Sequence, residues 1–465
     1  MRNADLTRLF LLFSTILSVC LAQRGLRTLI EWKEMEYSFP SNADRLQAIR
    51  DGLYVHGNGV PIDVDVHYGD SNMSNATING IKFPDSARDL SRIFVTIPRF
   101  TTGIPFTLGT VTNLPAEGGP QLVAYPRYSW HSSHGLDCNG ITSAFRVAID
   151  DCERLWVIDT GRIGNVQHCT PQLLVFDLRK DTLIHRYRFP QSQFKTAVSL
   201  LVTPIVDIRS QSHGCRKTMV YIADITGFGL LVYDYEANTS WRIENKLMFP
   251  NPDWGTFTIA GESFDLMDGL VGLALTPQSR GGRNEPSEGK YGGYPSSSRP
   301  PRERERYLYF HAMAGEVENR VPLSLVDNRT IWLNAPDSNP RDFVTIGRRG
   351  TQSAVMAIDS RDNMFFGLMN DIAVASWNIN TPYQRSNFKL VAQNPTTLQF
   401  ISGLKIKRSR INTEELWVMS NRFQKSAAGT KNSQEINYRI LGCNIDELLT
   451  TGCRTADHRD NLIFA

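Results

Sequence analysis

Three sets of side chains in this sequence could carry chemistry. Asp150 and Asp151 are adjacent carboxylates, His131 and His134 stand three residues apart, and the chain contains seven cysteines. Paired carboxylates can perform acid–base catalysis, closely spaced histidines can bind zinc, and cysteines can bind metal, exchange electrons or form disulfides. The elements around each set decide between these roles.

The carboxylate and histidine sets favour structural roles. Asp150 and Asp151 separate two strand-like runs, and aspartate is common in turns because it hydrogen-bonds the backbone. His131 and His134 have no evident third ligand, so we expect them to be surface residues of a loop, with no metal site and no cofactor. The sequence also contains no nucleophile elbow, dinucleotide fingerprint or phosphate-binding loop. Nothing in these motifs requires an enzyme.

The first residues predict an exported protein. Arg2 and Arg8 precede the apolar run Leu9–Leu21, and small residues follow. Thirteen residues are too few to span a bilayer, which needs about 20. We therefore expect residues 1–22 to be a secretory signal peptide, cleaved after Ala22, and the mature protein to be extracellular.

Composition agrees with export. Removing the signal peptide leaves six cysteines, an even number that favours disulfides in an oxidising compartment. Four glycosylation triplets begin at Asn72, Asn75, Asn238 and Asn328. The chain has 50 Lys and Arg against 47 Asp and Glu, a net charge of +3, which argues against nucleic acid or a membrane surface as the main partner. We expect a monomer.

The strand pattern predicts one all-β domain over residues 23–465. Short apolar runs ended by Gly, Asn, Asp or Pro recur along the chain, and they group in fours. In the fourth group the strands are predicted at Leu270–Leu275, Tyr307–His311, Val321–Val326 and Phe343–Ile346. The sixth group lacks one strand, which the N-terminal segment Leu29–Phe39 could supply. This is the pattern of a six-bladed β-propeller with four-stranded blades, closed by an N-terminal strand. A β-sandwich or two separate all-β domains are the alternatives.

Two segments fall outside this pattern. Residues 278–306 are rich in Gly, Pro, Ser and charge, and we expect a disordered insertion within the fourth blade. Residues 454–465 form a C-terminal tail.

The propeller hypothesis predicts which cysteines form disulfides with each other. Six cysteines allow 15 pairings, but only some lie on the same face of neighbouring elements. Cys152 and Cys215 fall in the first turns of the second and third blades, and Cys138 and Cys169 share the opposite face of the second blade. Cys443 and Cys453 can close a local loop. We therefore expect the disulfides Cys138–Cys169, Cys152–Cys215 and Cys443–Cys453.

A propeller offers one natural small-molecule site, its central channel. The pattern places Asp268, Gly269, Thr351, Gln352 and either Phe365 or Phe366 near its mouth or wall. Asp268 could pair with an ammonium, a phenylalanine could stack on an aromatic ring, and Thr351 and Gln352 could bind ring hydroxyls. The same residues could equally be turns that precede inner strands, with the phenylalanines in the core.

Several stretches resemble the yellow/major royal jelly protein family of insects. They include "RIFVTIPRFTTGIPFTL", "SAFRVAIDDCERLWVIDTG", "GTQSAVMAIDSRDNMFFGLMNDIAVASWN" and "ELWVMSNRFQ", in the family's order from about residue 30 to residue 445. The sequence departs from the family pattern at "DGLVG" and in its long insertion after "LALTP". The resemblance implies a six-bladed propeller, secretion, glycosylation, and roles in cuticle, eggshell, pigmentation or the binding of small amines.

Two functions compete at this point. We expect an extracellular protein that binds a small aromatic amine or a catechol-derived ligand, or assembles with matrix proteins, without turnover. The alternative is an enzyme of the melanin pathway that tautomerises dopachrome, an activity that the resemblance makes possible. In that case Asp268 could be the base, and Thr351 or Gln352 the donors that stabilise enolate charge.

Overall fold

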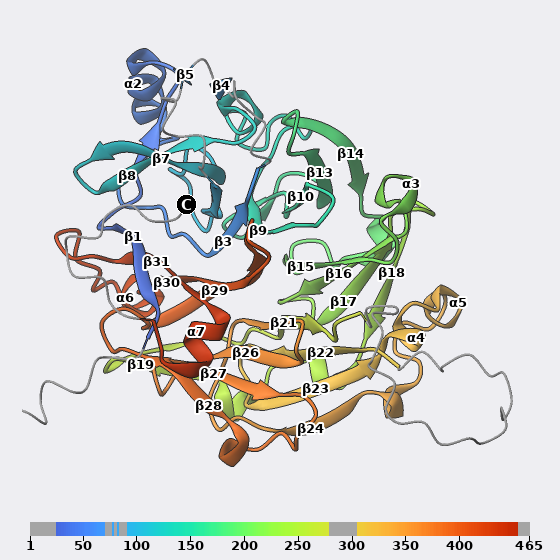
Figure 1. Ribbon diagram of the computed structural model, residues 1–465. Helices are drawn as coiled ribbons and strands as arrows, with labels where there is room; N and C mark the ends of the chain where they lie inside the picture. Colours follow the sequence, from blue (N-terminus) through green and yellow to red (C-terminus); the bar gives the residue numbers. More distant parts are fainter. Residues whose placement is uncertain (1–24, 70–76, 79–80, 83–90, 279–304, 454–465) are drawn as a thin grey trace, which may run out of the picture.

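The computed structural model describes residues 25–69, 77–78, 81–82, 91–278 and 305–453. Within these residues, six antiparallel sheets of four or five strands surround a central channel (Figure 1). The fold is a six-bladed β-propeller, as the strand pattern predicts.

Each blade begins with a strand at the channel and adds strands outward. The inner strands of blades one to six are β3 (Asp63–His67), β9 (Ala144–Ile149), β15 (Leu201–Ile208), β21 (Leu270–Leu275), β25 (Met356–Ile358) and β29 (Phe400–Arg408). The second strands are β6 (Arg92–Thr96), β10 (Arg154–Asp159), β16 (Thr218–Asp224), β22 (Tyr307–Ala312), β26 (Asn363–Leu368) and β30 (Glu414–Asn421). The third strands are β7 (Leu108–Ala116), β13 (Gln172–Asp177), β17 (Gly229–Asp234), β23 (Val317–Pro322), β27 (Ala373–Asn378) and β31 (Tyr438–Asn444).

The outermost strands complete the blades. They are β8 (Gly119–Ala124), β14 (Thr182–Arg188), β18 (Thr239–Glu244), β24 (Val344–Arg348), β28 (Lys389–Gln393) and, for blade six, β1 (Arg27–Trp32). A short strand, β2 (Tyr37–Ser38), adds in parallel to β8.

The N-terminal strand closes the ring. β1 pairs antiparallel with β31, so that Trp32 lies opposite Tyr438, and blade six contains both ends of the propeller. The Trp32 side chain is fully buried, and its indole N–H donates to the Pro120 carbonyl of blade one at 2.7 Å. This arrangement confirms the predicted closure, and it pairs strand edges that would otherwise be exposed.

The burial of the strands explains the sequence pattern. The middle strand β10, with the sequence RLWVID, is buried along its whole length because neighbouring blades cover both faces of the sheet. The outer strand β14, with the sequence TLIHRYR, has no fully buried residue. Middle strands are therefore nearly continuous apolar runs, whereas outer strands carry polar residues.

One predicted strand in blade four is wrong. Val321–Val326 was expected to be the third strand, but β23 spans Val317–Pro322 and the short helix α4 occupies Leu323–Val326. Pro322 is the N-cap of that helix. Proline has no backbone N–H, so it cannot donate a hydrogen bond to a neighbouring strand and is tolerated where the strand ends. Leu323 and Val326 are both buried, and their spacing of three is helical. A short apolar run cannot distinguish a strand from a buried helical turn by composition alone.

All three predicted disulfides are present. Cys138–Cys169 joins two loops of blade two, Cys152–Cys215 links blades two and three, and Cys443–Cys453 ties β31 to the segment that follows it. The helix α7 (Ile445–Thr450) lies within the last of these loops.

Several sequence predictions fall partly or wholly outside the described residues. These are the signal peptide, the glycosylation sites Asn72 and Asn75, residues 279–304 of the insertion, and the tail 454–465. The other two residues predicted to be glycosylated are described and exposed: Asn238 lies in the turn between β17 and β18, and Asn328 precedes the helix α5 (Arg329–Trp332).

Candidate functional site

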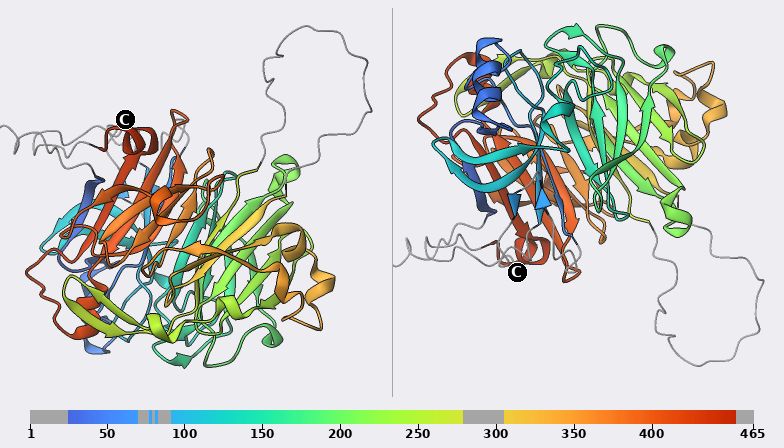
Figure 2. Two further views of the ribbon diagram at one scale, coloured as in Figure 1. Left: turned by 90° about the horizontal axis from the view of Figure 1, so that it is seen from below. Right: turned by 90° about the horizontal axis from the view of Figure 1, so that it is seen from above.

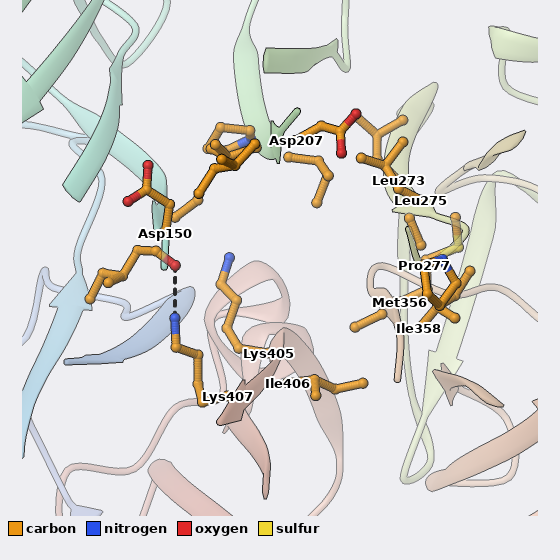
Figure 3. A pocket seen from close by; sticks show the side chains of 18 of the residues that line it. Asp150, Asp207, Leu273, Leu275, Pro277, Met356, Ile358, Lys405, Ile406 and Lys407 are labelled. Carbon is orange, nitrogen blue, oxygen red and sulfur yellow. Dashed lines mark hydrogen bonds between the residues drawn. The ribbon is translucent and has the colours of Figure 1, made fainter. Parts of the chain in front are cut away.

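The central channel contains a cavity of about 600 Å³. Residues of all six inner strands, and of the turns that follow several of them, line it, and it opens on the face that carries the Cys152–Cys215 disulfide. Figure 3 shows two different walls, one with lysine and aspartate side chains and the other aliphatic. The volume falls within the range of small-molecule sites.

The aliphatic wall comes from blades four, five and six. Its side chains are Leu273 and Leu275 on β21, Met356 and Ile358 on β25, and Ile406 on β29 (Figure 3). Leu273 and Leu275 share one face of β21, and Met356 and Ile358 share one face of β25, whereas Ile406 lies on the face of β29 opposite to Lys405 and Lys407. This wall could hold a ring or an alkyl group.

The polar wall is built where β29, β3 and β9 meet. Lys405 Nζ lies 3.0 Å from Asp63 Oδ2 and donates to the Val147 carbonyl at 2.8 Å. The Val147 N–H in turn donates to Asp63 Oδ2 at 3.1 Å. Burial raises the pKa of the Asp63 carboxyl, and the charges of Lys405 and Arg146 oppose that shift. The three residues thus connect blades one, two and six.

The same arrangement repeats two residues further along each strand. Lys407 Nζ lies 3.1 Å from Asp65 Oδ1 and donates to the Ile149 carbonyl at 2.8 Å, while the Ile149 N–H donates to Asp65 Oδ2 at 2.7 Å. The inner edge of β9 is therefore paired by side chains instead of a strand. We call these two units the Lys405 rung and the Lys407 rung.

Arg146 on β9 forms the floor of the cavity. Its guanidinium donates to Thr203 Oγ1 at 2.6 Å, to the Ala354 carbonyl at 3.2 Å and to the Ser402 carbonyl at 2.8 Å. These contacts join blade two to blades three, five and six. Burial lowers the pKa of Arg146, and the charge of Asp63 opposes this shift.

Asp207, at the end of β15, organises the mouth. It accepts hydrogen bonds from Arg209, from Arg306 at 2.8 Å and from Gln278 at 2.9 Å. Burial works against its ionisation, but the hydrogen bond from Arg306 and the charges of both arginines hold the pKa of Asp207 below its ordinary value. Gln278 and Arg306 flank residues 279–304, so both sides of the insertion are attached here.

The opposite end of the channel is closed. The hairpin of β19 (Thr256–Ile259) and β20 (Glu262–Asp265) runs along that face of the disc, as Figure 2 shows in yellow-green. Phe257 and Ile259 of the hairpin are buried in one apolar cluster with residues at the starts of the inner strands, including Phe145, Val202, Val271, Val355 and Ile401.

The hairpin is held at its far side by blade six. Lys425 in helix α6 (Phe423–Ala428) lies 2.7 Å from Glu262, and Thr430 donates to the same carboxylate at 2.5 Å. The Phe264 ring contacts the Phe423 ring at a centroid distance of 5.6 Å. The hairpin thus bridges from blade four to blade six across the channel.

Asp268 and Gly269 lie at this closed end, directly before β21. Burial raises the pKa of the Asp268 carboxyl to about 7. Gly269 is required by close packing, because an added Cβ would lie 2.5 Å from both the Phe228 ring and the Met248 carbonyl. Phe228 and the half-exposed Phe249 make a ring pair at 5.0 Å beside them.

Thr351 and Gln352 precede β25 at the same end. Both are buried; Gln352 Nε2 donates to the Trp254 and Thr256 carbonyls, and Thr351 Oγ1 accepts from the Asn370 N–H at 3.0 Å. The sequence analysis places these residues near the mouth or wall of the channel; in the structure both pairs lie at its closed end, and none of the four residues lines the cavity.

Phe365 and Phe366 lie on the second strand of blade five. Both are fully buried, Phe365 in the large central cluster and Phe366 against the rings of Tyr383 and Phe388. Neither lines the cavity.

The carboxylate and histidine sets have partners within the fold. Asp150 accepts from the Arg154 guanidinium at 2.8 Å and the Trp156 indole at 2.7 Å, as well as from backbone N–H groups of its turn. The expectation that His131 is a surface residue is wrong: it is fully buried, and burial lowers its pKa to about 3. Its Nε2–H donates to the Tyr125 carbonyl at 2.9 Å, and its Nδ1 faces the Thr107 N–H at 3.4 Å.

The sequence reading missed the polar wall and the floor. Arg146, Lys405 and Lys407 are charged residues within inner strands of a propeller, where a buried charge needs a partner. The spacing of the two lysines in "LKIKR" places both on one face of β29, and this was the available signal.

Comparison with known proteins decides the family. The family model "Major royal jelly protein" matches residues 142–285 and 287–453, which include the five inner strands after β3. The chain belongs to this family.

Relatives in the major royal jelly protein family cover nearly the whole chain. Major royal jelly protein 9 of Apis mellifera is 33% identical over 429 residues, which are 90% of this chain and 88% of the relative. Major royal jelly protein 8 of the same species is 32% identical over 439 residues, 91% of this chain and 92% of the relative. Dopaminechrome tautomerase of Drosophila melanogaster is 28% identical over 446 residues, 94% of this chain and 86% of the relative.

Proposed function

We propose that this protein is a secreted extracellular protein that binds a small aromatic amine or a catechol-derived molecule in the propeller channel. The observation that carries the proposal is the cavity of about 600 Å³, with an aliphatic wall facing a wall of hydrogen-bonding groups. Such a site buries a ring on one side and orients its polar substituents on the other.

Export is supported by several independent features. The apolar run Leu9–Leu21 follows the pattern of a signal peptide, three disulfides are characteristic of oxidising compartments, and royal jelly proteins are among the relatives. Among the described residues, no helix has the length and apolar character needed to span a membrane.

A tautomerase of the melanin pathway is the second candidate, and the Drosophila relative named dopaminechrome tautomerase supports it. Tautomerisation needs a base that removes a carbon-bound proton and donors that stabilise the resulting charge. Lys405 and Lys407 could be the donors. Three of the lining carboxylates, Asp63, Asp65 and Asp207, lie 3.0, 3.1 and 2.8 Å from Lys405, Lys407 and Arg306, so each would have to leave a cationic partner to reach a carbon-bound proton of a ligand. We therefore favour binding without turnover.

Two measurements separate the candidates. Calorimetric titration with dopamine and with serotonin measures binding, and the decay of dopaminechrome absorbance with added protein measures turnover. Stoichiometric binding without acceleration supports the proposal, and catalytic acceleration supports the tautomerase. If neither occurs, a structural role in cuticle, eggshell or another extracellular matrix replaces both.

Two variants locate the ligand along the channel. Leu275→Trp places an indole at the cavity mouth and should abolish binding if the ligand occupies the cavity. Asp268→Asn removes the carboxylate at the closed end and should weaken amine binding only if the ammonium lies there. The second result would restore the site that the sequence suggested, with Asp268, Gly269, Thr351 and Gln352 around the ligand and Phe365 or Phe366 behind it.

A further inference from the structure

The two rungs of the polar wall offer unused hydrogen-bond donors. A lysine ammonium carries three N–H groups. In each rung an aspartate and a backbone carbonyl of β9 take two of them, and no third acceptor occurs among the described residues. Lys405 and Lys407 both line the cavity, and Figure 3 shows both side chains on its polar wall. Each rung therefore has one donor for a ligand.

The spacing of these donors is fixed by the backbone. Lys405 and Lys407 are two residues apart on one strand, which is about 6.6 Å. Their carbonyl partners, Val147 and Ile149, have the same separation on β9, so the ammonium groups keep this distance. Two oxygens on adjacent carbons of a ring fit between them, with each oxygen accepting from one ammonium.

The charge of the wall selects the kind of oxygen. Lys405 is paired with Asp63 and Lys407 with Asp65, so the two rungs together carry no net charge. A carboxylate ligand would gain attraction from two ammonium groups but would also meet two carboxylates close by. Neutral hydroxyl or carbonyl oxygens avoid this repulsion and still accept the two hydrogen bonds.

The opposite wall selects the rest of the ligand. The side chains of Leu273, Met356 and Ile358 are apolar, and all three residues line the cavity (Figure 3). A planar hydrocarbon ring can be buried against them while its oxygens face the lysines.

We propose that Lys405 and Lys407 determine specificity by binding the two adjacent oxygens of an ortho-dioxygenated aromatic ring, in its catechol or quinone form. The inference rests on the proposed function, namely that the channel binds a small aromatic molecule. It adds that recognition depends on the oxygen pair and takes place at the open end of the channel, away from Asp268.

A graded set of ligands tests this inference by calorimetry. Dopamine has two ring hydroxyls, tyramine has one and phenethylamine has none, while all three keep the same amine; catechol keeps both hydroxyls and lacks the amine. The expected affinity order is dopamine, then tyramine, then phenethylamine, with catechol binding detectably. Lys405→Met and Lys407→Met should each weaken dopamine binding about tenfold and leave phenethylamine unchanged.

Lys195→Met is the matched control. Lys195 also pairs with a carboxylate, Glu244 at 3.3 Å, and donates to a backbone carbonyl, that of Gly227 at 3.0 Å, but it lies outside the cavity. Its substitution should leave dopamine binding unchanged. Circular dichroism checks folding, and Asp63→Asn combined with Lys405→Met replaces the single variant if the unpaired Asp63 prevents folding.

The outcomes distinguish the two proposals. Equal affinities for the three amines, unaffected by the lysine variants, would overturn the role of the oxygen pair and leave amine binding intact. Benzoate binding as tightly as catechol would overturn the preference for neutral oxygens. Absence of binding by every ligand would overturn both proposals.

Discussion

The side-chain amide of Gln352 donates to the backbone carbonyl of Trp254 at 3.0 Å, and so fastens the β19–β20 hairpin to blade five. The same nitrogen donates to the Thr256 carbonyl at 2.9 Å. Gln352 is 3% exposed, so water cannot replace these bonds. The hairpin is thereby held over the channel from blade five as well as from blade six.

Removing this amide should loosen the hairpin. We expect Gln352→Ala to lower the free energy of unfolding by roughly 1–3 kcal/mol, because two carbonyls lose a buried donor. Hydrogen exchange should accelerate in Thr256–Asp265 before it does so elsewhere. Gln384→Ala, at an exposed position of the same blade, is the control and should change neither quantity.

The Asp268 carboxyl should make stability depend on pH. Its pKa of about 7 in the folded protein exceeds the value near 3.9 of an unfolded chain. The folded state therefore holds the proton more tightly, and this contribution to stability is complete below pH 4 and is lost as the pH rises through 7. Asp268→Asn should unfold at a higher urea concentration than the wild type at pH 8 and at a similar concentration at pH 4. A difference that does not grow with pH would contradict this assignment; Asp253→Asn, an exposed position in the same connection, serves as the control.

The disulfide between blades two and three should stabilise the ring. Cys152 and Cys215 are 63 residues apart, a loop whose closure is worth about 4 kcal/mol in the unfolded chain. We expect the double serine variant to lose a comparable free energy of unfolding in urea. Intact mass before and after reduction should differ by six hydrogens for the mature chain, and a reactive thiol in the unreduced protein would disprove this cysteine assignment.

Closure by β1 should depend on Trp32. Truncation to alanine leaves a cavity between blades six and one and removes the hydrogen bond to Pro120, so we expect a loss of about 3–5 kcal/mol in urea unfolding. Trp32→Phe keeps much of the ring volume and should cost less. Equal effects of the two substitutions would show that the indole N–H, and not packing, dominates.

The fold was predictable because each strand and turn is recognisable from a short stretch of neighbouring residues. Buried middle strands such as β10 and short turns recur in groups of four, which favours a ring of blades over a β-sandwich, and blade geometry then limited the possible disulfide pairings. The strand predicted at Val321–Val326 was wrong because this apolar run has a length that suits either a strand or a helical turn, and the predicted strand Leu29–Phe39 ends at Trp32, with Tyr37–Ser38 joining blade one.

The site was less predictable because it depends on strands remote in sequence. Asp63 and Lys405 stand 342 positions apart and meet only when the ring closes. Asp268 and Gln352 both precede inner strands, which is why the sequence analysis grouped them, but nothing in residues 256–265 indicated that this hairpin would lie at their end of the channel. The cavity consequently lies at the other end of the channel.

Among the described residues, Phe257 and the apolar residues clustered with it cover one end of the channel, and the cavity opens at the other end. Entry and exit must then pass the same opening, beside Asp207 and Leu275. Any group that narrows this opening slows capture and escape by the same factor, because both cross the same barrier. Residence time could therefore change by orders of magnitude at constant affinity, a property suited to a protein that stores its ligand.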